Sequence, residues 1–199
     1  MQIDLEHLHY WMCAIRESEN PMRTLDAFWQ GQMRSKEWLI NCLDDIELTP
    51  MPMSIDIHGG WVGVLASMLF QSNIPISSIR SIDIDPSCES IATMMNKKEE
   101  IEGRFRAVTA DMCTVRSDAD IIINTSCEHI SQYEYDMWLG GMPHNSLFVL
   151  QSNNYKITEH IRTARNLEDF KEQSGLSKIH YAGEMAFPQY TRYMVIGHV

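Results

Sequence analysis

Apolar residues recur at helical spacing over about the first 48 residues, and the pattern then changes to short apolar runs. The first helix is predicted by apolar residues three or four positions apart: Leu5, Leu8, Met12 and Ile15. Further helical patterns follow the Asn20-Pro21 break and residue 35. Because proline lacks the amide donor and restricts its predecessor, we expect a linker over residues 49–53. We therefore expect an N-terminal helical cap over residues 1–48, joined in one compact unit to a domain over residues 49–199.

Beyond this linker, apolar runs that predict strands alternate with stretches that predict helices. The expected strands are residues 54–57, 79–84, 105–109, 119–124, 146–151, 178–184 and 192–199. The expected helices are residues 64–70, 88–95 and 167–173. Such alternation predicts an α/β fold, a Rossmann-like doubly wound sheet that is mostly parallel with right-handed crossovers. The last two strands are close in sequence and predict an antiparallel pair at one edge.

A glycine-rich turn, His58-Gly59-Gly60-Trp61-Val62-Gly63, lies between the first strand and its helix. Glycine lets the backbone approach a ligand and adopt positive φ, and a helix N-terminus offers free amide donors. The second strand ends in Asp83 and Asp85, where a carboxylate can accept the hydroxyl protons of a ribose. Turn and acid together predict an adenosine-containing cofactor. A tight turn without a ligand, and a helix cap at Asp85, are the structural alternatives.

Residues 54–128 resemble the class I S-adenosylmethionine-dependent methyltransferases. The family's first motif is an acid followed by a glycine-rich loop, which Asp56, Gly60 and Gly63 match, whereas His58 stands where the first glycine usually lies. The resemblance implies S-adenosyl-L-methionine as the cofactor. It also implies a set of cofactor-binding residues: Asp56, His58, Gly59, Gly60, Trp61, Gly63, Asp83, Asp85, Asp111, Met112 and Asn124.

The segment after the fourth strand, residues 124–129, corresponds to the family's fourth motif and implies where catalysis occurs. Catalytic groups collect at the carboxyl ends of parallel strands. The catalytic candidates are therefore Ser126, Glu128 and His129, of which the last two can accept a proton from a hydroxyl or an amine. A structural role for His129, capping the next helix or packing in the core, is equally expected.

Composition narrows the choice of partner and location. The chain has 27 acidic and 16 basic residues and a net charge of -11, which disfavours nucleic acid and favours a small-molecule or peptide substrate. Five scattered cysteines without a CxxC pair predict neither disulfides nor a metal site, and they suit a reducing cytoplasm. We find neither a signal-peptide pattern nor an apolar run long enough to cross a membrane. A homodimer remains an open alternative to a monomer.

These observations lead to one expected function and three alternatives. We expect an S-adenosylmethionine-dependent transferase, a methyltransferase that acts on a small molecule. The substitution at His58 leaves open the transfer or cyclisation of the aminocarboxypropyl arm, which releases methylthioadenosine. The shared turn and acid leave open a NAD-dependent oxidoreductase. A non-catalytic binding module is the remaining alternative, favoured if His58 and Trp61 block the pocket.

Overall fold

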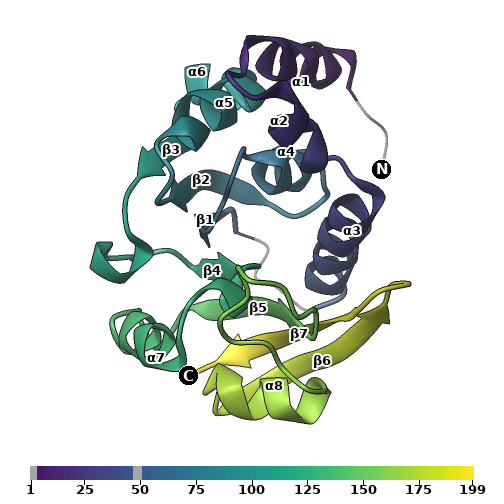
Figure 1. Cartoon of the computed structure of the whole chain (residues 1–199). Coiled ribbons are helices and arrows are strands. Elements are labelled where there is room, and N and C mark those ends of the chain that lie inside the picture. Colours follow the sequence, from purple (N-terminus) through teal and green to yellow (C-terminus); the bar gives the residue numbers. More distant parts are fainter. Residues whose placement is uncertain (1–3, 47–50) are drawn as a thin grey trace.

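The computed structural model describes residues 4–46 and 51–199, and it begins with three helices (Figure 1). They are α1 (Leu5–Glu17), α2 (Pro21–Asp26) and α3 (Gln30–Asp44). Asp4 caps α1 and Asn20 caps α2, since each side chain accepts a hydrogen bond from a backbone amide of the first turn. Helix α3 begins earlier than expected, at Gln30. The expected domain boundary at residues 48 and 49 lies outside the described residues.

Seven strands form one sheet, as predicted, with ends shifted by a few residues. They are β1 (Met53–His58), β2 (Ile76–Asp83), β3 (Phe105–Thr109), β4 (Ile121–Asn124), β5 (Leu147–Asn153), β6 (Lys178–Ala186) and β7 (Thr191–His198). Their order is β3-β2-β1-β4-β5-β7-β6. The first five are parallel, and β7 is antiparallel to both β5 and β6. The predicted Rossmann-like sheet with an antiparallel edge is therefore confirmed.

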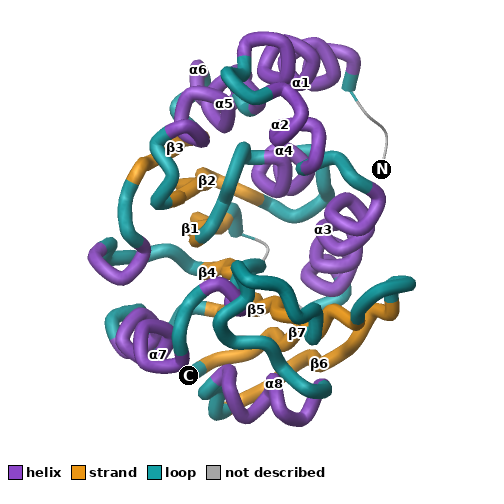
Figure 2. The backbone as a smooth tube through the Cα atoms, in the orientation of Figure 1, coloured by secondary structure: helices purple, strands orange, loops and turns teal. Residues whose placement is uncertain are grey.

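Helices cover both faces of the sheet (Figure 2). The side chains of strand β4 alternate between these faces. Ile121 and Ile123 lie in a core that includes the N-terminal helices, whereas Ile122 lies in a second core on the other face. The remaining helices are α4 (Val64–Phe70), α5 (Ser87–Met95), α6 (Lys97–Ile101), α7 (Gln132–Gly140) and α8 (Leu167–Ser174). Burial on both faces explains the nearly pure isoleucine sequence of β4. In the described part of the chain, we find no helix that is long and apolar enough to span a bilayer.

Helix α7 was not expected from the sequence, although two signals for it are present. Ser131 and Glu134 form a capping box at its start. Tyr135, Trp138 and Leu139 follow at helical spacing and are buried. This helix packs its aromatic residues against the second core, beside β1 and β4.

The N-terminal helices share a core with the sheet. Trp11 of α1 donates a hydrogen bond to Ser67 of α4 over 2.8 Å, and both side chains are buried. Leu39 and Leu43 of α3 are fully buried in the same cluster as Ile55 of β1. These helices therefore belong to the packed body of the protein.

His58 lies at the end of β1 on the face that α7 covers. It is fully buried, and Trp138 Nε1 donates to its Nδ1 over 3.2 Å. Burial lowers the pKa of His58 to about 4, with a smaller opposing effect from Asp56. The ring is therefore neutral in the folded protein at neutral pH.

Gly63 ends the glycine-rich loop in a left-handed conformation, with φ of 79°. A Cβ there would lie 2.7 Å from Asn96 Nδ2 and 3.0 Å from the backbone of Ala92. Asn96 Nδ2 is itself held by hydrogen bonds to the carbonyl oxygens of Gly63 and Ala92. This position therefore requires glycine for both its φ and its packing.

We predict that Gly63→Ala destabilises the fold more than Gly103→Ala does. Gly103 also has a positive φ, 73°, but no described atom lies within 4 Å of the place that a Cβ would take there. Gly103→Ala should lose about 1–2 kcal/mol of unfolding free energy from the backbone alone. Gly63→Ala should lose roughly 1–3 kcal/mol more from overpacking. Urea denaturation measures both, and equal losses would contradict the packing argument.

We also predict that His58 makes stability fall as the pH drops from 6.5 towards 4. In that window the unfolded chain binds a proton at this position and the folded chain does not, so protonation favours unfolding. The contribution is about 1.4 kcal/mol per pH unit, roughly 3 kcal/mol in total. Urea titrations at several pH values should show a shallower decline for His58→Gln than for wild type. The exposed His144→Gln serves as the control, and a parallel decline in His58→Gln would refute the prediction.

Candidate active site

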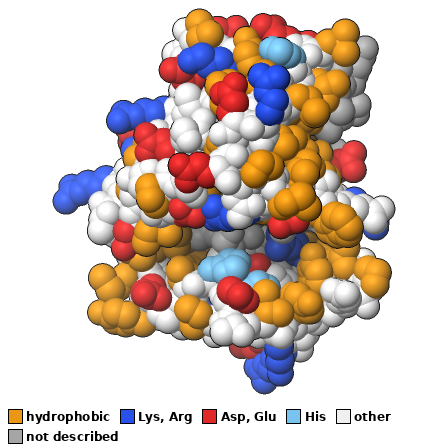
Figure 3. Space-filling view, turned by 45° about the horizontal axis from the view of Figure 1, so that its top comes forward, with side chains coloured by type: hydrophobic (Ala, Val, Ile, Leu, Met, Phe, Trp, Pro, Cys, Tyr) orange, Lys and Arg blue, Asp and Glu red, His pale blue; other side chains and the backbone are white. Residues whose placement is uncertain are grey.

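A cavity of about 740 Å³ opens at the carboxyl ends of β1, β2 and β4. Its size is typical of small-molecule sites. The lining comes from the β1–α4 loop, the ends of β2 and β4, the turn after β3, and helices α2 and α3. Figure 3 shows a hollow on this face, with histidine side chains beside it. The cavity lies where open α/β sheets bind ligands.

The β1–α4 loop forms one wall of the cavity through Gly59, Gly60 and Trp61. Gly59 has φ of 69°, and Trp61 has φ of 50°, which is unusual for a residue with a side chain. The Trp61 amide donates to Asp83 Oδ2 over 2.8 Å, which holds the loop against the end of β2. Such backbone strain is commonly found where a loop is shaped for a ligand.

Asp83 and Asp85 both line the cavity. Besides the Trp61 amide, the Asp83 carboxylate accepts from the Asp85 amide, over 3.0 Å. Each Asp83 oxygen keeps a further lone pair, so the half-buried carboxylate can still accept hydrogen bonds from hydroxyl groups. Asp85 accepts from Ser87 at the start of α5 and pairs with Arg23 over 2.6 Å. The hydrogen bond from the Ser87 hydroxyl is the main cause that lowers the pKa of Asp85.

Three further predicted residues also line the cavity: Asp111, Met112 and Asn124. Asp111 is exposed, and its Oδ1 accepts from the Cys113 amide over 2.9 Å. The Asn124 side chain is buried and accepts from the Ser126 amide over 2.9 Å. The structure therefore gathers these three with the glycine-rich loop and Asp83 around one cavity.

Three predicted cofactor residues lie outside the cavity lining: Asp56, His58 and Gly63. Side chains alternate along a strand, so Ile55 and Ile57 face the first core while Asp56 and His58 face the other side. Asp56 is buried and forms an ion pair with Arg80. The structure therefore places Asp56 and His58 away from the cavity lining, and their expected contact with the cofactor stays a prediction. Gly63 shapes the turn without lining the cavity.

All three catalytic candidates line the cavity: Ser126, Glu128 and His129. Glu128 is only 1% exposed, and its Oε1 accepts from Asn153 and lies 3.4 Å from Arg192 Nη2. The His129 side chain is exposed, and the next helix is capped by Ser131 instead. The two structural alternatives for His129, a helix cap and a core position, therefore do not apply.

Several residues that line the cavity come from distant parts of the chain and were not among the predicted site residues: Arg23, Gln32, Lys36, His160 and Arg192. Burial, with a smaller repulsion from Arg192, lowers the pKa of Lys36 to about 7. Its Nζ donates to Gln32 Oε1 over 3.0 Å. The only signal for Lys36 is a cation beside the apolar face of a helix, which many surface helices share.

Comparison with known proteins gives a fold and little sequence similarity. No family model matches the chain, and no curated protein matches it. The solved structure of PhzM, a pyocyanin biosynthetic protein, has a TM-score of 0.65 at 15% identity, covering 95% of this chain and 62% of PhzM. The mitomycin 7-O-methyltransferase MmcR gives 0.65 at 13%, covering 95% and 60%. The chain thus spans about three fifths of these two proteins.

A third solved structure is similar in length as well as in fold. Magnesium protoporphyrin IX methyltransferase (ChlM) from Synechocystis PCC 6803, solved with bound SAM, has a TM-score of 0.65 at 15% identity. The match covers 96% of this chain and 91% of that protein. The TM-scores of 0.65 establish the architecture, whereas identities of 13–15% do not establish the chemistry, which has to be argued from the site itself. Together with the sheet order and the cavity at its carboxyl edge, these scores show that this chain has the class I S-adenosylmethionine-dependent methyltransferase fold.

Proposed function

We propose that this chain binds S-adenosyl-L-methionine in the cavity and transfers its methyl group to a small molecule. The observation that carries the proposal is the Asp83 carboxylate, fixed by the Trp61 amide at the cavity wall. It is supported by the similar fold of ChlM, whose structures contain SAM and SAH. When bound, the cofactor supplies a methyl group activated by a sulfonium.

The residues of the cavity fit such a cofactor. Asp83 would accept hydrogen bonds from the ribose hydroxyl groups, and Asp111 would accept a hydrogen bond from the adenine amino group. Gly59 and Gly60 bring backbone close to the ligand, since neither carries a side chain into the cavity. Trp61 and Met112 would cover apolar surface of the adenosine and exclude water.

The acceptor substrate would bind beside Ser126, Glu128 and His129. His129 Nδ1 lies 3.1 Å from the Glu159 carbonyl oxygen, so Nδ1 donates and Nε2 can accept a proton. Lys36, with its pKa of about 7, is a second group that can accept a proton at neutral pH. The Ser126 hydroxyl would hydrogen-bond the substrate and help to hold its nucleophile in line.

The geometry weakens two of the alternatives. His58 was the reason to consider transfer of the aminocarboxypropyl arm, yet its side chain lies in the second core, against Trp138. The same position removes His58 as a block to the cavity, which remains open to about 740 Å³ beside Trp61. Methyl transfer is therefore preferred over both arm transfer and a non-catalytic module.

We predict that Asp83→Ala weakens binding of S-adenosylmethionine at least tenfold. Each charge-assisted hydrogen bond to the ribose that is lost removes about 1.5–3 kcal/mol of binding free energy. Each step of about 1.4 kcal/mol is a factor of ten in affinity. Calorimetric titration of wild type and variant measures the change. Asp136→Ala, on the exposed face of α7, should bind like wild type.

Equal affinities in Asp83→Ala and wild type would refute this assignment of the ribose site. Absence of binding in the folded wild-type protein would refute the cofactor itself. The thermal melting curve of each variant, recorded without ligand, separates lost binding from lost folding.

We also predict that turnover leaves S-adenosylhomocysteine as the cofactor product. Incubation with S-adenosylmethionine and pools of small hydroxylated or amine compounds, followed by mass spectrometry, identifies the product. Release of methylthioadenosine instead would show that the aminocarboxypropyl arm is the group transferred or cyclised. The Asp83→Ala protein serves as the inactive control.

A further inference from the structure

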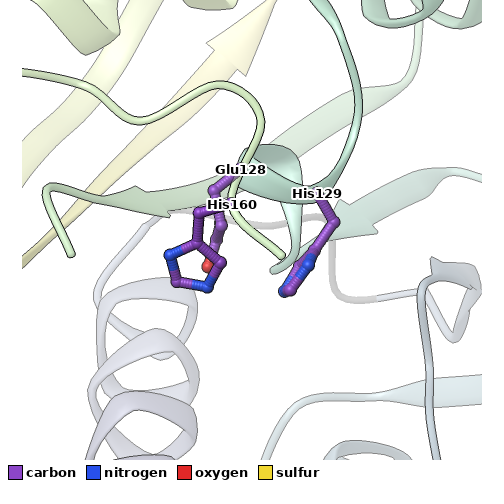
Figure 4. A group of neighbouring side chains, drawn as sticks. All are labelled: Glu128, His129 and His160. Atoms are coloured by element: carbon purple, nitrogen blue, oxygen red, sulfur yellow. The ribbon is translucent and has the colours of Figure 1, made fainter. Parts of the chain in front are cut away.

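Glu128, His129 and His160 converge on the cavity wall beyond the end of β4 (Figure 4). Glu128 and His129 follow β4 directly, whereas His160 comes from the segment between β5 and α8. One nitrogen or oxygen from each lies within 4.8 Å of those from the other two. The two imidazole rings meet edge to face, with centroids 4.8 Å apart. These three side chains are called the Glu-His-His cluster below.

Hydrogen bonds to the backbone fix the tautomer of both histidines. His129 Nδ1 lies 3.1 Å from the Glu159 carbonyl oxygen, and His160 Nδ1 lies 2.7 Å from that of Tyr155. A carbonyl oxygen only accepts, so both Nδ1 atoms carry the hydrogen and, in the neutral rings, both Nε2 atoms carry a lone pair. Metal-binding histidines commonly donate their other ring N–H in this way.

The Glu128 carboxylate is oriented by its own partners. Its Oε1 accepts from Asn153 and lies 3.4 Å from Arg192 Nη2. Its Oε2 is buried and has no hydrogen-bond partner among the described residues. A buried carboxylate oxygen without a partner is unfavourable. The same carboxylate lies in one cluster with two histidines whose Nε2 atoms carry lone pairs, so a cation bound there would supply the missing partner.

We propose that the Glu-His-His cluster binds one divalent first-row transition cation of the Mn²⁺, Fe²⁺, Co²⁺ or Zn²⁺ class. Two imidazoles and one carboxylate suit these cations, whereas Mg²⁺ and Ca²⁺ prefer oxygen ligands. Bonds of about 2.1 Å place ligand atoms about 3–3.5 Å apart, so the exposed His129 moves inward on binding. Arg192 offsets part of the Glu128 charge, which weakens the attraction of the cluster for a cation.

The cation would take up the Nε2 lone pair of His129, so that Lys36 would then be the proton acceptor. It would leave coordination positions open toward the cavity, and this use of it rests on the proposed methyl transfer. A substrate oxygen can occupy such a position, and a hydroxyl bound to a divalent cation has a lowered pKa. The site would then favour a hydroxyl substrate, or one with neighbouring oxygens, over an amine. The cation therefore specifies a substrate class for the proposed enzyme.

Titration of the metal-free protein with cobalt(II) chloride tests the proposal, followed by calorimetry and by visible absorption of the bound ion. We expect one Co²⁺ per chain in wild type. His129→Ala and His160→Ala should each weaken binding at least tenfold. His180→Ala is the matched control, since it removes the other close pair, in which His180 Nε2 lies 3.0 Å from His198 Nδ1.

Lack of stoichiometric binding by wild type, or unchanged binding in both cluster variants, would overturn the proposal. Near-ultraviolet circular dichroism checks that the variants are folded, which is expected because His129 is exposed and His160 is half-buried. Titration of the same samples with S-adenosylmethionine keeps the two proposals separate. Cofactor binding without Co²⁺ binding refutes only the metal site, and Co²⁺ binding without cofactor binding refutes only the proposed function.

Discussion

The candidate active site depends on the close approach of the β1–α4 loop to the end of β2. A side chain at Gly60 would place its Cβ only 2.0 Å from Ser81 Oγ, so the backbone reaches β2 because glycine stands there. The Gly60 amide donates to the Ile82 carbonyl oxygen over 3.0 Å, and the next amide donates to Asp83. These contacts bring the loop and the acidic end of β2 to one wall of one cavity.

Strand β1, which leads into this loop, contributes side chains to both faces of the sheet. Its alternating side chains send Ile55 and Ile57 into the core beneath the N-terminal helices. Asp56 and His58 face the opposite side, where Asp56 pairs with Arg80 and His58 packs against Trp138. The acid of the first motif is therefore a structural ion pair in this chain, and the histidine in place of glycine is a buried neutral base.

The fold could be predicted from local patterns because each strand of the sheet is marked by its own run of residues. Apolar runs separated by turn residues gave all seven strands, and the end of the second strand gave Asp83. Asp111 and Asn124 were expected as cavity residues through the family resemblance. The face of the sheet to which a side chain points was harder to predict than its position along the chain. A strand end is visible in the sequence, but the side to which Asp56 points depends on the sheet register. Residues that reach the cavity from distant segments, such as His160 and Arg192, have no local signal at all.

The two halves of the cavity differ in chemistry. The half beside Asp83 offers acceptors and backbone, which suits the ribose and adenine of a nucleoside. The half beside Glu128 offers a buried carboxylate, two imidazoles and the Arg192 guanidinium, which suits a polar acceptor and its proton. This division matches a reaction between a bound cofactor and a second molecule.

A crystal structure of the protein with S-adenosylhomocysteine tests the central claim most directly. The account predicts electron density for the ribose at the Asp83 carboxylate, with the nucleoside against Gly59, Gly60 and Trp61. It also predicts an unchanged His58, still packed on Trp138. Density at another location, or an empty cavity at saturating ligand in solution and crystal, would contradict the account.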